Sequence, residues 1–222
     1  MREMKNYLQA VLLIILLSPA LSGGFSSVYA DTDNSLRTDL NFQYTINDKF
    51  RFLSYVFMQA DRDMSNYDYL EWGTGIVYQT PVKWLAFVFY YQQGYTKSEP
   101  GKWLLEQRPS ININFSTAIH NFKITNQIRC EYRINDDWHD YRLKNYLEIA
   151  RPDIFLQPYC GWEMYYENYN RQITLNRIKF GIMKEIDKYI SMGPYYRVDF
   201  ANVNDHWELA RHLFGFQVTI KL

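Results

Sequence analysis

The sequence has few of the features that mark the commonest classes of protein. It holds only 2 cysteines in 222 residues, and its 24 lysines and arginines are matched by 24 aspartates and glutamates. A neutral chain lacks the bulk positive charge on which many nucleic-acid binders rely, so we expect no nucleic-acid partner. Beyond residue 30, no apolar stretch reaches the roughly 18 residues that a membrane-spanning helix needs. A helical membrane bundle is therefore excluded.

Aromatic side chains, by contrast, are abundant. The chain has 20 tyrosines, 14 phenylalanines and 6 tryptophans, while its mean hydropathy is −0.39. A transmembrane β-barrel exposes only every second residue to lipid, so its mean hydropathy resembles that of a soluble protein although one face is apolar and aromatic. The composition is compatible with a membrane protein made of strands, and it excludes a disordered chain.

Residues 1–30 have the pattern of a secretory signal peptide. Arg2 and Lys5 precede the apolar run Leu8–Leu17, and Val28–Ala30 offers small residues for cleavage. The apolar run is too short to span a membrane. We predict an exported protein with a signal peptide at 1–30 and one mature domain at 31–222, although cleavage after residue 20 or 22 also fits the pattern.

Apolar and polar residues alternate with the period of two that is typical of strands. The clearest segment is 122–134, where one face holds Phe122, Ile124, Ile128, Cys130, Tyr132 and Ile134. The same alternation predicts strands at 36–45, 50–60, 67–79, 84–94, 103–116, 140–150, 154–167, 172–184, 188–199 and 208–222.

The predicted connections differ at the two ends of the strands. Those near 47–48, 80–81, 118–119, 151–152 and 186–187 are short, whereas those at 61–66, 95–102, 135–140, 168–171 and 200–207 are longer and polar. Outer-membrane barrels have short periplasmic turns and longer extracellular loops. We therefore predict an all-β fold, an antiparallel transmembrane β-barrel of ten to twelve strands in the bacterial outer membrane. Because such barrels have even strand numbers, we favour twelve, with residues 25–33 as the additional strand.

Further features favour a monomer surrounded by outer-membrane lipids. Trp84, Trp103, Trp138, Tyr189 and Trp207 lie at predicted strand ends, where barrels carry aromatic girdles. The last strand keeps an apolar face up to Leu222, which suits recognition by the barrel assembly machinery. The alternative is a soluble periplasmic β-barrel that binds a ligand, in which the apolar face would point inward.

Several segments resemble one bacterial family. They are Glu106–Pro109, Asn126–Arg133, Pro158–Tyr166 and Asn176–Ile182. On these motifs, the chain resembles an uncharacterised outer-membrane family, domain of unknown function twenty-four ninety. The resemblance implies an outer-membrane barrel and brings no activity, cofactor or site residue with it.

If the apolar face meets lipid, the charged face lines the lumen. The candidate lining and binding residues are Glu106, Arg108, Arg129, Glu131, Arg133, Arg142, Lys144, Glu163, Glu167, Arg177, Lys179, Arg197 and Asp199. With Arg37, Asp39, Glu71 and Arg211 they place ten positive and seven negative charges in the outer half. These charges either pair and fill the lumen or form a constriction that attracts anions. The function hypothesis is a narrow or gated pore for small anionic solutes, with a weak anion preference.

A lipid-modifying or lipid-hydrolysing enzyme is the other alternative. His212 is predicted to face outward without a serine neighbour, while His139 and His206 lie in loops beside aspartates. These histidines are the only catalytic candidates, and no metal-ligand spacing or phosphate-binding glycine loop is present. We expect no metal and no cofactor. Cys130 and Cys160 fall on outward faces two strands apart, at least about 9 Å from each other, and we therefore expect free thiols.

Overall fold

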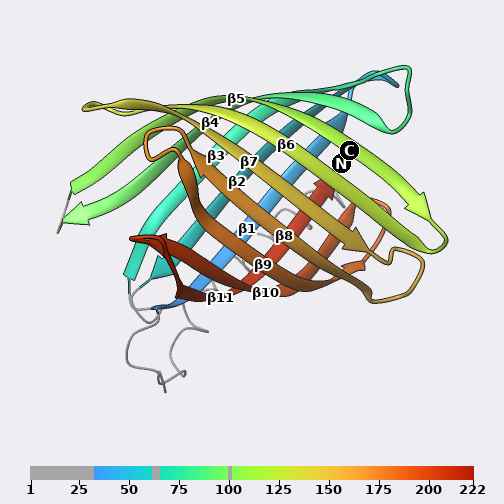
Figure 1. Cartoon of the computed structure of the whole chain (residues 1–222). Coiled ribbons are helices and arrows are strands. Elements are labelled where there is room, and N and C mark those ends of the chain that lie inside the picture. The colour runs from blue at the N-terminus through green and yellow to red at the C-terminus, as the bar shows by residue number, and fades with distance from the viewer. Residues whose placement is uncertain (1–32, 62–65, 100–101) are drawn as a thin grey trace.

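The strands close into a single barrel (Figure 1). The computed structural model describes residues 33–61, 66–99 and 102–222. The predicted signal peptide lies outside these residues, and no described helix is long and apolar enough to cross a membrane. The strands are β1 (Asp33–Thr45), β2 (Phe50–Asp61), β3 (Asn66–Gln79), β4 (Leu85–Glu99), β5 (Lys102–Ile119), β6 (Phe122–Ile134), β7 (His139–Ala150), β8 (Gln157–Glu167), β9 (Gln172–Glu185), β10 (Ile190–Val203) and β11 (His206–Lys221).

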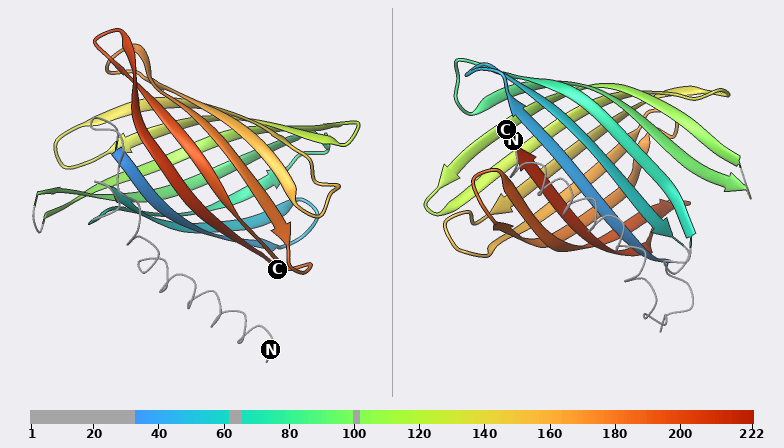
Figure 2. Two further views of the ribbon diagram at one scale, coloured as in Figure 1. Left: turned by 90° about the horizontal axis from the view of Figure 1, so that it is seen from below. Right: turned by 180° about the vertical axis from the view of Figure 1, so that it is seen from behind.

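The barrel closes through a parallel pair, which corrects the strand number that we favoured. Neighbours along the chain pair antiparallel, but β1 pairs with β11 in parallel, from Asp33 opposite Arg211 to Gln43 opposite Lys221 (Figure 2). The described residues hold eleven strands, within the predicted range but not twelve. Eleven strands are joined by ten antiparallel steps, and an even number of reversals makes the first and last strands run the same way. A parallel ladder still pairs their edge groups, so an even number is not required.

The predicted difference in loop length between the two ends is not found, because the connections between strands have two to four residues at one end and two to six at the other. We call the end that carries Leu222 and the turn at 46–49 the C-terminal end, and the opposite end the far end. At the far end, β10 and β11 continue into the segment predicted as a loop and leave only Asn204 and Asp205 between them. Both residues have positive φ, 51° and 65°, as in the two-residue turns that join long hairpins. The connection is short because two turn-forming residues suffice.

The outer face is a band of exposed apolar side chains. Phe89, Phe180 and Phe214 point outward and are 55%, 51% and 43% exposed. The predicted girdle residues Trp84, Trp103, Trp138, Tyr189 and Trp207 are also exposed, at the two ends of the strands. Soluble monomers rarely expose apolar surface of this extent, whereas a lipid-facing barrel requires it. Cys130 and Cys160 lie on this face as free, exposed thiols, as predicted.

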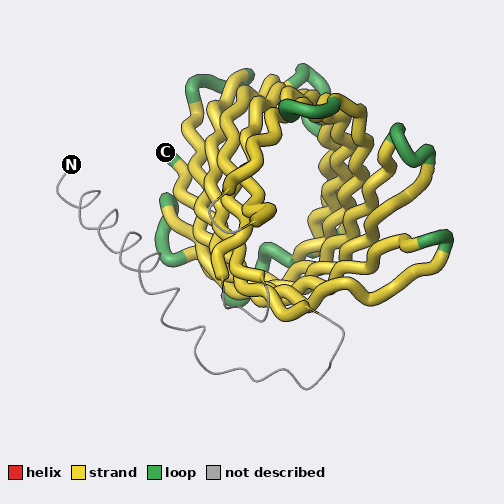
Figure 3. The backbone as a smooth tube through the Cα atoms, turned by 90° about the vertical axis from the view of Figure 1, so that its left-hand side faces the viewer, coloured by secondary structure: helices red, strands yellow, loops and turns green. Residues whose placement is uncertain are grey.

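Towards the C-terminal end, the lumen that the strands surround (Figure 3) holds clusters of buried apolar and aromatic side chains. One cluster comprises Val77, Ala86 and Val88, and another comprises Tyr159, Tyr195 and Leu213. The tyrosine rings lie against inward glycines of the neighbouring strand. A Cβ atom built on Gly181 would lie 2.4 Å from the Tyr159 ring, and one on Gly215 would lie 2.0 Å from the Tyr195 ring. A larger residue at either position would therefore meet the tyrosine ring unless the ring moved.

Candidate functional site: a charged cavity in the lumen

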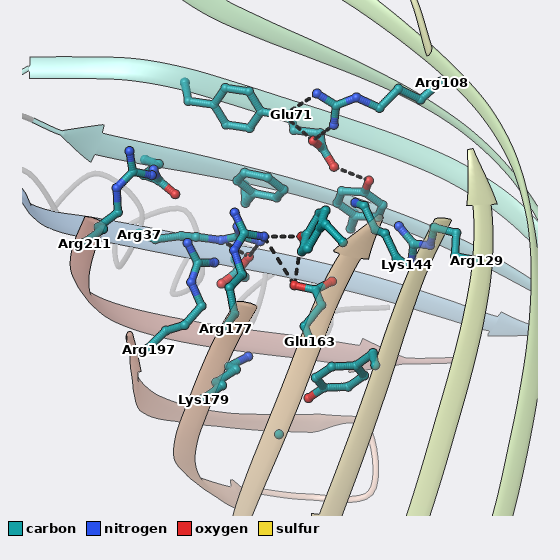
Figure 4. A pocket seen from close by; sticks show the side chains of 18 of the residues that line it. Arg37, Glu71, Arg108, Arg129, Lys144, Glu163, Arg177, Lys179, Arg197 and Arg211 are labelled. Carbon is teal, nitrogen blue, oxygen red and sulfur yellow. Dashed lines mark hydrogen bonds and ion pairs between the residues drawn. The ribbon is translucent and has the colours of Figure 1, made fainter. Parts of the chain in front are cut away.

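A cavity of about 900 Å³ occupies the far half of the lumen (Figure 4). Its lining begins near the far end, at Thr96 and Lys97, and extends inward to Tyr55, Tyr90 and Tyr195. Val88, the inward residue beyond Tyr90 on β4, does not line it, whereas Gln217, two residues beyond Gly215 on β11, does. The cavity is therefore a cup with charged walls above a floor of tyrosines.

The thirteen predicted lumen residues all belong to this cup or to its ion pairs. Ten line the cavity: Glu106, Arg108, Arg129, Arg133, Arg142, Lys144, Glu163, Arg177, Lys179 and Arg197. The other three, Glu131, Glu167 and Asp199, do not line it but form ion pairs with residues that do. The structure thus brings the set together.

Glu131 on β6 is the centre of one charge cluster. Its side chain is 0% exposed, and one carboxylate serves three cations. Arg142 approaches through two nitrogens at 2.8 and 2.7 Å, Lys144 Nζ lies at 2.8 Å, and Arg129 Nη1 lies at 3.5 Å. Because β6 and β7 are paired, Arg129 lies opposite Lys144 and Glu131 opposite Arg142. The cluster has more positive than negative groups around a buried acid.

A second cluster lies on β3 and β5 around Glu71. The carboxylate accepts hydrogen bonds from Tyr55 at 2.5 Å and from Tyr69, and Arg108 Nη1 lies 2.5 Å away. Arg108 also reaches Glu106, whose two oxygens accept from Arg133 Nε and Nη2 at 2.8 and 2.7 Å. Such a fork is the strongest geometry for an arginine–carboxylate pair. These side chains are fixed, so this wall of the cup is rigid.

The third cluster spans β8, β9 and β10. Asp199 is 3% exposed and accepts from Arg197 Nε and Nη2 at 2.7 and 2.9 Å, while Arg177 Nε lies at 3.3 Å. Arg177 also contacts Glu163 at 3.3 Å. The ring of Tyr165 lies about 5 Å or less from several cationic groups, with Lys144 Nζ and Arg177 Cζ each at 4.7 Å from its centroid.

Lys179 lies near the cavity floor without a carboxylate of its own. Within the described residues, no acidic oxygen lies within 4.0 Å of its ammonium group, whose polar contact is Gln217 Oε1 at 3.3 Å. The nitrogen lies 3.8 Å from the centroid of the Tyr195 ring and 5.3 Å from that of Tyr159. Aromatic faces stabilise the ammonium here, and its charge stays unneutralised by any direct ion pair.

Sequence reasoning missed several lining residues. Asp61, Asp68 and Lys97 fall in far-end segments that the sequence predicted to be loops or loop borders, and Glu148 and Asp33 were not assigned to the outer half. With them, the cavity and its ion-pair partners hold eleven basic and eleven acidic side chains. The predicted excess of positive charge inside the barrel is therefore wrong for this set as a whole, because strands that continue to the far end add acids.

The surface of the cavity nevertheless carries an excess of positive charge. Its lining has eleven lysines and arginines against eight aspartates and glutamates. The difference arises because Glu131 and Asp199 are buried beneath the cations that they bind, and Glu167 lies at the far-end terminus of β8. A solute in the cup therefore meets a surface that is more cationic than its walls are in total.

The candidate histidines do not gather at one place. His212 faces outward, where its Nδ1 lies 2.5 Å from the hydroxyl of Tyr196 and the two rings stack at 6.0 Å. His139 lies against Tyr132, and His206 begins β11 at the far end. Among the described residues, no group of three or more His, Cys, Asp or Glu could hold a metal ion. The three candidate histidines thus lie apart from one another and do not line the cavity.

Comparison with known proteins identifies a family and a similar solved structure. The model of the family described as "Protein of unknown function (DUF2490)" matches residues 36–210. Among solved structures, LpxR from Salmonella typhimurium is similar with a TM-score of 0.48 and 6% sequence identity, over 80% of this chain and 84% of that chain. No curated protein matches the sequence.

Proposed function

The chain belongs to the DUF2490 family, whose function is unknown, and we propose that it is an outer-membrane barrel that admits small anionic solutes to its cationic cup and passes them at low conductance. The far end faces the cell exterior, and the C-terminal end faces the periplasm. The signal peptide predicted at 1–30 directs export, and the apolar face of β11 is the part that the barrel assembly machinery recognises.

The outward apolar band supports the membrane location. Exposed phenylalanines such as Phe89 and Phe180 alternate with inward polar residues along the same strands. In water this surface would promote association, whereas hydrocarbon accepts it without cost. Outer-membrane lipids are therefore the partners of the outer face.

The observation that carries the proposal is the layered arrangement of charge in the cup. Arg129, Arg142 and Lys144 line the cavity, while the carboxylate that they share, Glu131, is fully buried behind them. The field of a fixed charge falls with distance, so an entering ion interacts more strongly with the front layer. Low-dielectric walls focus that field into the lumen. The cup thus attracts anions although its charges balance overall.

The dimensions support a small solute. A cavity of about 900 Å³ falls in the range of small-molecule sites, and the packed residues beneath its floor leave little room for a wide channel. Low conductance follows from this narrowing. Paired charges within the walls also keep the anion preference weak, because acids such as Glu71 and Glu163 line the same cavity.

Reconstitution into planar bilayers tests the proposal. Purified protein under a potassium chloride gradient should give small current steps whose reversal potential shows more permeation by chloride than by potassium. Adding small carboxylates or phosphate to the far-end side should reduce the chloride current, because these anions compete for the cup. Large steps, cation preference or complete lack of conductance would contradict the proposed function.

A further inference from the structure

Beneath the cup, one wall of the lumen is polar. The inward residues of β5 and β6 in this region are Ser110, Asn112 and Asn114 on β5 with Thr125 and Gln127 on β6. We call these five residues the polar seam. Gln127 lines the cavity and donates from Nε2 to Asn114 Oδ1 at 3.0 Å. The seam therefore begins at the floor of the cup and continues towards the C-terminal end.

Polar atoms in and beside the upper part of the seam are buried without hydrogen-bond partners. They are both amide atoms of Asn112, the hydroxyl of Ser110, Nε of Arg129 and Oε1 of Gln92. These residues are neighbours in the sheet, since Ser110 lies beside Asn112 along β5, Asn112 pairs with Arg129, and Arg108 on β5 pairs with Gln92. Nearly all buried polar atoms in folded proteins have a partner, and water supplies it where protein does not. Five such atoms in one place indicate a position that water or a polar solute occupies.

The layer that closes the seam is thin. Asn112 is 0% exposed and lies opposite Arg129, which lines the cavity, whereas Asn114 and Thr125, further towards the C-terminal end, are partly exposed. A single layer of side chains therefore separates the cup from the lumen below. By contrast, the apolar wall has Val77, Ala86 and Val88 buried together, which keeps it dry.

Arg129 is suited to cover this layer because it is held weakly. Its contacts are Gln127 Oε1 at 3.1 Å and Glu131 Oε1 at 3.5 Å, and its guanidinium lies 5.6 Å from the centroid of the Tyr90 ring. Arg142 binds the same Glu131 through two nitrogens at 2.8 and 2.7 Å. Of the two arginines, Arg129 loses less by moving.

A second polar wall lacks the unpartnered atoms. On β11, Gln217 accepts from Lys179 and donates to Thr219 Oγ1 at 3.5 Å, and Asn41 on β1 donates to the carbonyl of Val218 at 3.4 Å. Polarity alone thus does not identify a route, whereas unmet hydrogen-bonding capacity distinguishes the seam from this wall.

We propose that the polar seam is the route by which water and small anions cross the C-terminal half of the lumen, with Asn112 at its narrowest point and Arg129 as the side chain that covers it. This inference rests on the proposed function, which it supplies with a path and a gate. Movement of Arg129 exposes the amide of Asn112 to the cup, so that a passing anion exchanges water for amide and hydroxyl donors.

Cysteine accessibility tests the route without requiring a current. In a background with Cys130→Ala and Cys160→Ala, Asn112→Cys is compared with Val88→Cys, its inward neighbour on the apolar wall, using a small anionic methanethiosulfonate reagent in liposomes. Asn112→Cys should react about tenfold faster, because a dry apolar site excludes the reagent. Adding Arg129→Ala should accelerate Asn112→Cys further and leave Val88→Cys unchanged. Equal rates, or no acceleration by Arg129→Ala, would overturn the route or its gate.

Conductance gives the second measurement. Asn112→Leu keeps a similar volume but removes the amide, and it should lower chloride conductance about tenfold, because an apolar constriction loses water. Thr219→Val on the second polar wall is the matched control and should leave conductance unchanged. Heat-modifiable gel mobility verifies that each variant is folded.

The two proposals fail in different ways. If the wild type conducts with anion preference and Asn112→Leu conducts equally well, the seam is wrong while the proposed function stands. If the wild type carries no current but Asn112→Cys is labelled faster than Val88→Cys, the seam is a water path and the proposed function is wrong.

Discussion

In the far half of the lumen, arginines, lysines and carboxylates line a cavity, whereas towards the C-terminal end tyrosines, valines and glycines form a packed wall beside the polar seam. Charged side chains keep a cavity between them because each must retain partners or water. Tyrosine and valine pack to contact, helped by glycines that let a ring cross to the next strand. One barrel wall therefore supports two kinds of interior, a charged one that holds a cavity and a packed one that narrows the lumen.

The largest effect should come from removing the carboxylate at the centre of the charged half. Glu131→Gln leaves Arg129, Arg142 and Lys144 without their shared acid, in a site where Glu131 is 0% exposed. Breaking a buried ion cluster costs about 3–5 kcal/mol, which urea unfolding of the folded barrel in detergent measures.

Glu185→Gln is the matched control. Glu185 pairs with Lys221 at 3.8 Å, but the two side chains are 57% and 47% exposed, so the loss should stay below about 1 kcal/mol. Equal losses for Glu131→Gln and Glu185→Gln would mean that the far half is as well hydrated as the outer surface, and the comparison between halves would fail.

The packed half should respond to volume instead of charge. Gly181→Ala places a methyl group 2.4 Å from the Tyr159 ring, and overpacking of this kind costs about 1–3 kcal/mol. Tyr159→Ala removes the obstruction, so the double variant should be more stable than the sum of the two single changes predicts. Additive free energies of unfolding would show that the rings are loosely held.

The sequence predicted the wall better than the interior. Alternation located all eleven strands and placed residues such as Arg108 and Arg129 inward, because a period of two decides the face of every residue in a strand. It did not predict the parallel closure, because alternation does not specify which strands pair, and β1 and β11 lie at opposite ends of the chain. Nor did it predict that the strands extend to Asn204 and Asp205, whose left-handed conformation is a property of the turn.

Within the site, alternation did not predict which acids are buried behind the cations and which line the cavity. Glu131 and Glu163 alternate with apolar residues in the same way, yet Glu131 is buried behind three cations and Glu163 lines the cavity. The difference depends on how neighbouring side chains fold over one another, which is a matter of packing across strands. The excess positive charge at the cavity surface therefore required the structure.

A smaller effect should follow from removing one charge near the cavity floor. Lys179→Met keeps most of the side chain against Tyr195 but removes the ammonium that lacks an acidic partner. A unit charge at about 8 Å in water contributes about 0.5 kcal/mol, so the ratio of chloride to potassium permeability should fall about twofold. Lys188→Met, in the exposed turn before β10, should leave the ratio unchanged. If Lys179→Met leaves the permeability ratio unchanged, the anion selectivity arises from residues nearer the far end of the cup.

The smallest effect should come from the two thiols. They lie on the outer face of the barrel, whose apolar band surrounds both halves of the lumen. Cys130 and Cys160 are free and exposed on β6 and β8, with β7 between them, so their Cα atoms are at least about 9 Å apart, beyond disulfide reach. Replacing both by alanine should change the free energy of unfolding by less than about 1 kcal/mol. In liposomes, a lipid-soluble maleimide should label both cysteines, while a charged water-soluble maleimide should label neither, because hydrocarbon covers them. Rapid labelling by the charged reagent would mean that the apolar band is hydrated, and the contrast between a lipid-facing exterior and a water-accessible interior would be lost.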